Sequence, residues 1–139
     1  MTFEEKGNWT YAVIAVALAA IYFAIVLGRL PQTAAGDIAF QVPLLATIGA
    51  TIGLTIAAHI VVAIAAPDDA GKRDQRDKDI NRYGEYVGGL VLGIAMVVPL
   101  ILALAEVDHF WIANTIYLAF ILSTTAGSIV KIVAYRRGF

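Results

Sequence analysis

The chain has 139 residues, of which 60% are hydrophobic and 15% are charged, whereas soluble domains contain about 25% charged residues. The mean hydropathy of +0.77 and the net charge of −1 favour an integral membrane protein and exclude a basic nucleic-acid-binding domain. The lack of cysteine excludes disulfides, thiolate metal sites and lipidation at cysteine.

Four apolar stretches follow in chain order, each long enough for about 30 Å of hydrocarbon at 1.5 Å per residue. They cover residues 9–28, 42–66, 86–105 and 110–134. Pro43 opens the second stretch, and Pro99 lies inside the third, where its missing N–H predicts a kink. The sequence therefore predicts an all-α fold, an integral membrane four-helix bundle that forms a single transmembrane domain over residues 1–139 with a charged loop at 67–85.

The basic residues are distributed unevenly over the predicted loops. Nine of the ten Lys and Arg residues fall on one side of the four-span topology, and only Arg29 falls on the other. Because positive loops stay in the cytoplasm, we expect both termini and the 67–85 loop to be cytoplasmic. The predicted location is the cell inner (cytoplasmic) membrane, which the chain would cross several times.

The charged run at residues 72–82 holds five of the ten basic residues. Three acid–base pairs have helical spacing there: Asp69/Arg73, Asp74/Lys78 and Asp79/Arg82. They predict that the third helix begins near Asp74 and projects into the cytoplasm as a salt-bridged helix. The simpler interpretation is a solvated anchor of the topology. The alternative is a docking surface for a cytoplasmic regulatory protein or lipid head groups, with partner-binding candidates Arg73, Asp74, Arg76, Asp77, Lys78 and Arg82.

A polar stripe runs along the second span at four-residue spacing: Thr47, Thr51, Thr55 and His59. His59 is the only ionisable side chain well inside a predicted span, which makes it a functional candidate. An interhelical hydrogen bond is its simpler role. A ligand, metal or proton role is the alternative.

The fourth span carries a second polar stripe: Asn114, Tyr117, Thr124, Ser128 and Lys131. The second and fourth spans run in the same direction, so the two stripes can face each other across a polar seam or a narrow wet cavity. Ordinary polar contact between helices is the simpler interpretation. A pathway for an ion or a small molecule is the alternative.

Glycines at four-residue spacing allow close helix packing, either within the bundle or in a homo-oligomer. The candidates are Gly49, Gly53, Gly84, Gly88, Gly89 and Gly93.

Between the third and fourth spans, Glu106, Asp108 and His109 crowd a short turn, where we expect Asp108 to cap the last helix. Polar capping is a better interpretation of this turn than a metal site.

Two segments carry a family resemblance: Asp74-Gln-Arg-Asp-Lys-Asp-Ile and Arg82-Tyr-Gly-Glu-Tyr-Val-Gly. With the segments that begin at Ala105 and Gly127, they resemble an uncharacterised family of small bacterial four-helix membrane proteins with an Asp-Glu-Arg-Asp-type motif in the central loop. The likeness covers about the C-terminal half and departs at Gln75, where the family has Glu. Members look like proteins encoded beside small helix-turn-helix regulators, which implies a regulatory role and no catalytic residue.

The sequence thus favours a non-enzymatic interaction or regulatory module that acts through its charged cytoplasmic helix. One alternative is a small oligomeric transporter or channel that uses the polar seam around His59, since imidazole exchanges protons near neutral pH. Another is metal or haem binding at a subunit interface. No catalytic residue, metal site or cofactor is predicted. The expected partners are the lipid bilayer, a second copy of the chain and a cytoplasmic regulatory protein, with no nucleic acid.

Overall fold

The computed structural model describes residues 1–138, and within them every regular element is helical. The elements are α1 (Phe3–Leu27), the short 3₁₀ helix η1 (Ala35–Asp37), α2 (Gln41–Ala65), α3 (Gln75–Ala95), α4 (Val97–Leu104) and α5 (His109–Arg137). Four segments are long and apolar enough to cross a membrane, with α3 and α4 together forming one of them. The prediction of an all-α chain with four such helices is confirmed.

Local capping explains where α1 and α3 begin. The Thr2 hydroxyl accepts a hydrogen bond from the Glu5 N–H, and acidic residues in the first turn of α1 complement the helix dipole. At α3, Asp74 and Asp77 form a capping box, in which each carboxylate accepts a hydrogen bond from the other residue's backbone N–H. The predicted start of this helix near Asp74 is therefore confirmed.

Pro99 interrupts the third span, as its position predicts. The helix breaks at Met96, which separates α3 from α4. Proline has no N–H to donate to the carbonyl four residues earlier, so the helical ladder cannot continue unbroken through this turn. The buried Pro99 packs in the half of the bundle where α4 lies against α5.

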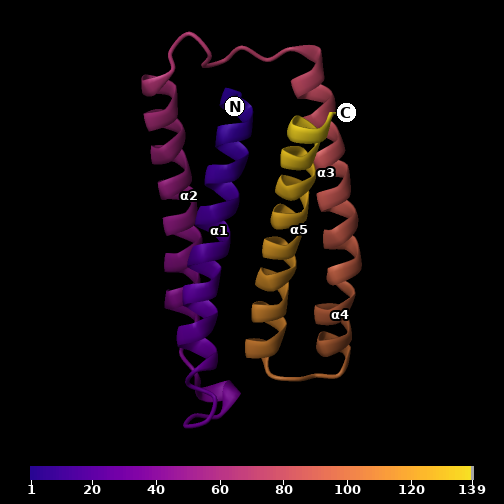
Figure 1. Cartoon of the computed structure of the whole chain (residues 1–139). Coiled ribbons are helices and arrows are strands. Elements are labelled where there is room, and N and C mark those ends of the chain that lie inside the picture. The colour runs from indigo at the N-terminus through magenta and orange to yellow at the C-terminus, as the bar shows by residue number, and fades with distance from the viewer. Residues whose placement is uncertain (139) are drawn as a thin grey trace.

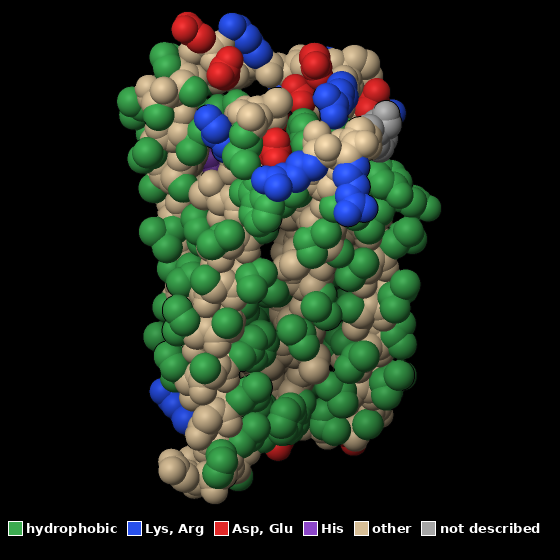
Figure 2. Space-filling view, viewed as in Figure 1, with side chains coloured by type: hydrophobic (Ala, Val, Ile, Leu, Met, Phe, Trp, Pro, Cys, Tyr) green, Lys and Arg blue, Asp and Glu red, His purple; other side chains and the backbone are tan. Residues whose placement is uncertain are grey.

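The helices lie side by side in the order α2, α1, α5 and then α3 with α4 (Figure 1). Both described ends of the chain and the 66–74 loop lie at one end of the bundle, called here the terminal end; the opposite end, with residues 28–40 and 105–108, is the hairpin end. The face in Figure 2 has hydrophobic side chains over its middle and most charged side chains at the terminal end. No residue of α2 is fully buried, because α2 packs mainly on α1.

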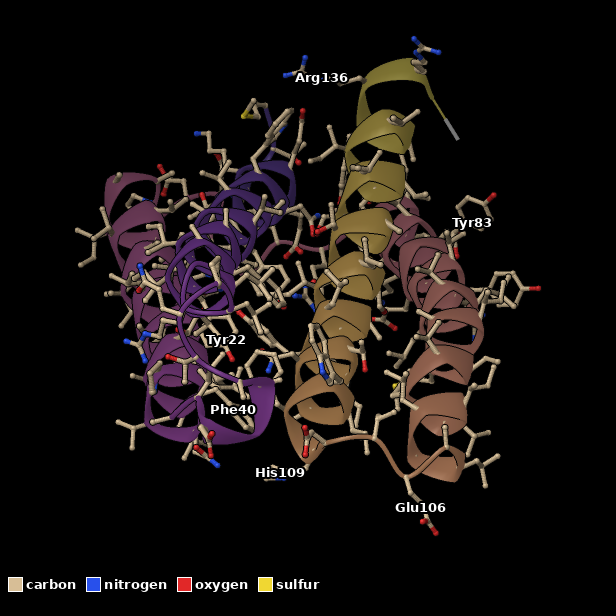
Figure 3. All side chains as sticks on the ribbon, turned by 90° about the horizontal axis from the view of Figure 1, so that it is seen from below. Tyr22, Phe40, Tyr83, Glu106, His109 and Arg136 are labelled. Carbon is tan, nitrogen blue, oxygen red and sulfur yellow. The ribbon has the colours of Figure 1, made fainter. Side chains whose placement is uncertain are left out.

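The apolar core lies toward the hairpin end, where α1 and α5 are in contact. Phe110 is completely buried and packs edge-to-face against Phe40, with 5.4 Å between ring centroids. Tyr22 extends from α1 into the space between α1 and α5 (Figure 3) and packs against Tyr117. This core packs α1 against α5 toward the hairpin end. Cavities lie beside α1 toward the terminal end.

Two of the glycines singled out in the sequence lie where α3 meets α5. A Cβ on Gly84 would collide with the side chain of Lys131, and one on Gly88 would lie 3.1 Å from the Ser123 carbonyl oxygen. Among residues 1–138, the other four predicted packing positions have open space where a Cβ would lie: Gly49, Gly53, Gly89 and Gly93. Spacing alone did not distinguish the inward pair from these outward ones.

Candidate binding site at the terminal end

Ion pairs at the terminal end join different helices. Arg73 Nε lies 2.8 Å from Glu4 Oε1, and Arg136 Nε lies 3.2 Å from Glu5 Oε1. The hydrogen bond to Glu4, followed by the charge of that carboxylate, raises the pKa of Arg73 above its ordinary value. Arg136 also lies over the ring of Trp9, 5.5 Å from its centroid.

The helix predicted to begin near Asp74 is present, but the salt bridges predicted along residues 69–82 are wrong. Among residues 1–138, none of the three predicted acid–base pairs forms. Asp69 and Arg73 precede the first residue of α3, so their four-residue spacing does not bring them together. Asp74 is occupied in the capping box, and Asp79 accepts a hydrogen bond from Gln75 instead.

The first turn of α3 also binds the last turn of α5. The Tyr135 hydroxyl donates a 2.8 Å hydrogen bond to Asp77 Oδ1. Arg76 donates to the backbone carbonyls of Tyr135 and Ala134, at 3.3 and 3.5 Å. The last carbonyls of a helix carry partial negative charge, so a guanidinium at this end of α5 is stabilising.

The six predicted partner-binding residues therefore divide into two groups. Four of them make contacts within the chain: Arg73, Asp74, Arg76 and Asp77. Lys78 and Arg82 are exposed, and neither takes part in an ion pair within residues 1–138. Only the second pair is free to meet a partner without disturbing the attachment of α3.

Most of the α2 polar stripe is satisfied by its own helix. The Thr47 hydroxyl donates to the Pro43 carbonyl at 2.7 Å, and the Thr51 hydroxyl donates to the Thr47 carbonyl at 2.8 Å. His59 Nδ1 lies 2.8 Å from the Thr55 carbonyl oxygen. Because a carbonyl can only accept, Nδ1 carries the proton of this contact, and Nε2 of a neutral ring is left as an acceptor.

His59 packs on α1 at a position without a side chain. Its Nε2 lies 2.9 Å from the place where a Cβ would project from Gly7. The side-chain hydrogen bond described for His59 stays within α2, so the predicted interhelical hydrogen bond is replaced by close packing of the ring on a glycine. Gly7 is thus what brings the imidazole against α1.

The α5 stripe divides between the core and the terminal half. Asn114 is buried, accepts from the Tyr22 hydroxyl and donates to the Phe110 carbonyl at 2.8 Å. Ser128 is buried farther along the helix, and Lys131 is half-buried over Gly84. Ser123 was not singled out in the sequence; its hydroxyl donates to the Gly88 carbonyl at 2.7 Å.

A groove of about 480 Å³ runs between α2 and α5, with α1 as its floor; it is called here the apolar groove. It brings together four residues of the two predicted stripes: Thr51, Thr55, Tyr117 and Thr124. The rest of its wall is mainly isoleucine with Phe120, so the predicted polar seam is instead a largely apolar surface with a few hydroxyl groups. Two of these groups, the Thr55 Oγ1 and the Tyr117 hydroxyl, are buried without a hydrogen-bond partner.

A second cavity, of about 290 Å³, lies between α1, α2 and the 66–74 loop; it is called here the polar pocket. Its lining includes His59, Asn8 and both members of the Arg73–Glu4 ion pair. The polar pocket and the apolar groove share Tyr11 and Thr55, so the two cavities adjoin.

Tyr11 also lines a third cavity, of about 240 Å³, between α1, α3 and α5. Lys131 and Ser128 of the α5 stripe reach this cavity. The site residues predicted from the sequence did not include Tyr11, Glu4 or Asn8. The two acids in the first helical turn, on the same side as nine basic residues, were the available signal for the ion pairs.

The two histidines lie toward opposite ends of the bundle. His109 begins α5 at the hairpin end and packs against Phe40, with 5.7 Å between ring centroids. No group of three or more Asp, Glu or His side chains with metal-site geometry occurs within residues 1–138.

Asp108 occupies the N-cap position of α5, but its side chain does not form the predicted capping hydrogen bond. It lies beside Gly36 instead. Glu106 points away from the bundle (Figure 3).

No protein family, curated protein or solved structure matches the chain. The resemblance of the 74–88 segment to a membrane-protein family therefore stays a prediction. Function has to be argued from the site itself, because a helical bundle alone supports many activities.

Proposed function

We propose that this chain is a non-enzymatic, multi-pass protein of the bacterial inner membrane that binds a cytoplasmic regulatory protein through the outer face of α3. The observation that carries the proposal is the division of the charged run. Four of its residues attach α3 to α1, to α5 and to its own first turn, while Lys78 and Arg82 remain exposed and outside any ion pair within residues 1–138.

The spacing of these two residues suits a single contact. Side chains four apart lie on the same side of a helix, so Lys78 and Arg82 present two positive charges one turn apart. The capping box and the contacts to α5 hold their backbone in place. A surface that is already ordered loses less conformational entropy on binding. A partner with an acidic patch fits this face, and its charge would also speed the encounter.

The proposal can be tested by photocrosslinking in native cells with benzoylphenylalanine at position 75, one turn before Lys78. We expect a discrete adduct that falls at least about tenfold in the double variant Lys78→Glu/Arg82→Glu, as loss of about 1.4 kcal/mol of binding free energy would produce. The matched control is Lys72→Glu/Arg137→Glu, which changes net charge by the same amount at exposed positions. No discrete adduct, or equal loss in both double variants, would contradict the proposal.

A further inference from the structure

The apolar groove and the polar pocket form one continuous surface along α2. Together they extend from Ile48 to His59, which is roughly 16 Å at 1.5 Å per residue. The groove volume of about 480 Å³ lies within the range of about 300–1,000 Å³ typical of small-molecule sites. The surface changes from apolar to polar along its length, with Tyr11 and Thr55 at the change.

Unpartnered hydroxyl groups lie in this surface. Tyr117 is 7% exposed, lines the groove, and its hydroxyl has no hydrogen-bond partner. Thr55 departs from the pattern of Thr47 and Thr51, whose hydroxyls bond to the carbonyl four residues earlier; its own Oγ1 is buried and unpartnered. A buried polar atom without a partner costs free energy, and a ligand with a hydroxyl or carbonyl oxygen would remove that cost.

The polar pocket indicates the charge of the head group. Arg73 is already neutralised by Glu4, so an anionic head group would have to displace that carboxylate. His59 Nε2 is an acceptor when Nδ1 donates to the Thr55 carbonyl, and the Asn8 side chain supplies both a donor and an acceptor. This combination matches a neutral head group that both donates and accepts hydrogen bonds.

We propose that the groove and the pocket together bind a single-chain amphiphile with a neutral, hydroxyl-bearing head group of the monoacylglycerol type. The chain would lie in the groove against isoleucine side chains of α2 and Phe120 of α5. The head group would occupy the pocket and donate to His59 Nε2. A diacyl phospholipid would bring a second chain and a phosphate, and the phosphate would have to displace Glu4 from Arg73. A helix of a second copy would leave the polar pocket unfilled.

The test uses the purified full chain in phosphatidylcholine nanodiscs and a monoacylglycerol with a diazirine in its acyl chain. We expect photolabelling of groove residues on α2 and α5, mapped by mass spectrometry, and competition by glycerol monolaurate. Tyr117→Phe and Thr55→Val should each reduce labelling about threefold, the effect of one hydrogen bond in a membrane. Thr47→Val and Tyr86→Phe are matched controls that should leave labelling unchanged, since the Thr47 hydroxyl bonds within α2 and Tyr86 is exposed on α3.

Four results would overturn the proposal. Labelling spread over the outer faces of all helices, without competition, would mean bulk lipid only. Stronger labelling by a diazirine lysophosphatidic acid would mean an anionic ligand. Crosslinks between two copies through the groove would mean that a second chain occupies it. Equal labelling of Tyr117→Phe, Thr55→Val and the parent would show that neither hydroxyl group contacts the ligand.

A groove-filling variant keeps the test decisive if a hydroxyl variant unfolds. Ile52 lines the groove and is 57% exposed, so Ile52→Trp adds bulk without disturbing the core. It should abolish labelling while the thermal unfolding midpoint stays at the parent value, and unchanged labelling would count against the groove. The site positions Thr55, Tyr117 and Ile52 lie on α2 and α5, away from the Lys78 and Arg82 face of α3, so this site and the proposed partner surface stand or fall separately.

Discussion

The hydroxyl of Tyr22 in α1 donates a hydrogen bond to Oδ1 of Asn114 in α5, and both side chains are buried. The two residues are 92 positions apart in the chain. Asn114 also donates to the Phe110 carbonyl, so its amide is satisfied at both ends. This hydrogen bond joins α1 to α5 beside the aromatic core. It therefore helps to fix the spacing of two of the helices that line the apolar groove.

Tyr22→Phe should lower the free energy of unfolding by about 1–2 kcal/mol, because it leaves the buried Asn114 oxygen without a partner while keeping the ring contacts. Reversible unfolding in mixed micelles, followed by circular dichroism, measures the change. Tyr86→Phe removes the hydroxyl of an exposed tyrosine and should have no effect. Equal stability of the parent and both variants would show that the hydrogen bond contributes nothing.

Gly127→Ala should separate α3 from α5. A Cβ at this position would lie 2.9 Å from the Gly84 carbonyl oxygen, which belongs to the backbone and cannot rotate away. We expect a loss of about 1–3 kcal/mol in the free energy of unfolding, as for other overpacked interiors. The same unfolding assay applies.

Gly89→Ala is the control for this substitution. It lies on α3, and apart from the nearby backbone of its own helix no atom of residues 1–138 lies within 4 Å of the added Cβ, so the variant should be neutral or gain up to about 1 kcal/mol from helix propensity. A destabilised Gly89→Ala would mean that a second molecule packs against that face. A neutral Gly127→Ala would contradict the close contact between α3 and α5.

Hydropathy and local signals predicted the helices but not their neighbours. Proline and capping residues mark where a helix breaks or begins, so the break before Pro99 and the start after Asp74 could be predicted from the sequence. The order α2, α1, α5, α3 could not, because side chains are apolar on both the protein-facing and outward-facing sides of each helix. Gly84 and Gly88 meet α5, yet the same spacing recurs at positions 89 and 93, which face open space.

The charged residues were misassigned for a related reason. Local spacing suggested pairs along one helix, but Arg73 pairs with Glu4, 69 residues earlier in the chain. The common direction of α2 and α5 did predict that their stripes could meet, and Thr55 and Tyr117 do line one groove. That its wall is mostly apolar depends on how the helices rotate about their axes, which spacing alone does not determine.

Gly7→Ala should force the His59 ring away from α1, because the added Cβ would lie 2.9 Å from Nε2. We expect a loss of about 1 kcal/mol or more in the free energy of unfolding. In a His59→Ala background the same substitution should cost little, since the colliding ring is absent. The coupling free energy from this double-mutant cycle should therefore be about 1 kcal/mol.

The control cycle pairs His59→Ala with Gly49→Ala, which lies on α2 with open space around it. The two effects should add. If the Gly7 cycle is also additive, the imidazole does not rest on Gly7, and the position of His59 in the polar pocket would have to be revised.

The Arg73–Glu4 ion pair should anchor the 66–74 loop to α1. Arg73 is half-exposed, so the stabilisation is small, about 0.2–1 kcal/mol, and loop position is a better readout than stability. The chain lacks cysteine, which permits spin labels at Asp68→Cys in the loop and Val13→Cys on α1. We expect a narrow distance distribution in the parent, a broad one in Arg73→Glu, and a narrow one again in Arg73→Glu/Glu4→Arg.

Salt rather than alkaline pH is the means of weakening this contact. The pKa of Arg73 is raised by its hydrogen bond to Glu4, so its stabilising contribution is complete below the ordinary arginine pKa and is lost only above the raised value. Raising the pH through the neutral and mildly alkaline range should leave the distance distribution unchanged. Raising ionic strength to 1 M should broaden it, because the Debye length falls to about 3 Å. A distribution that stays narrow in Arg73→Glu and at high salt would mean that backbone contacts hold the loop and that the ion pair only lines the polar pocket.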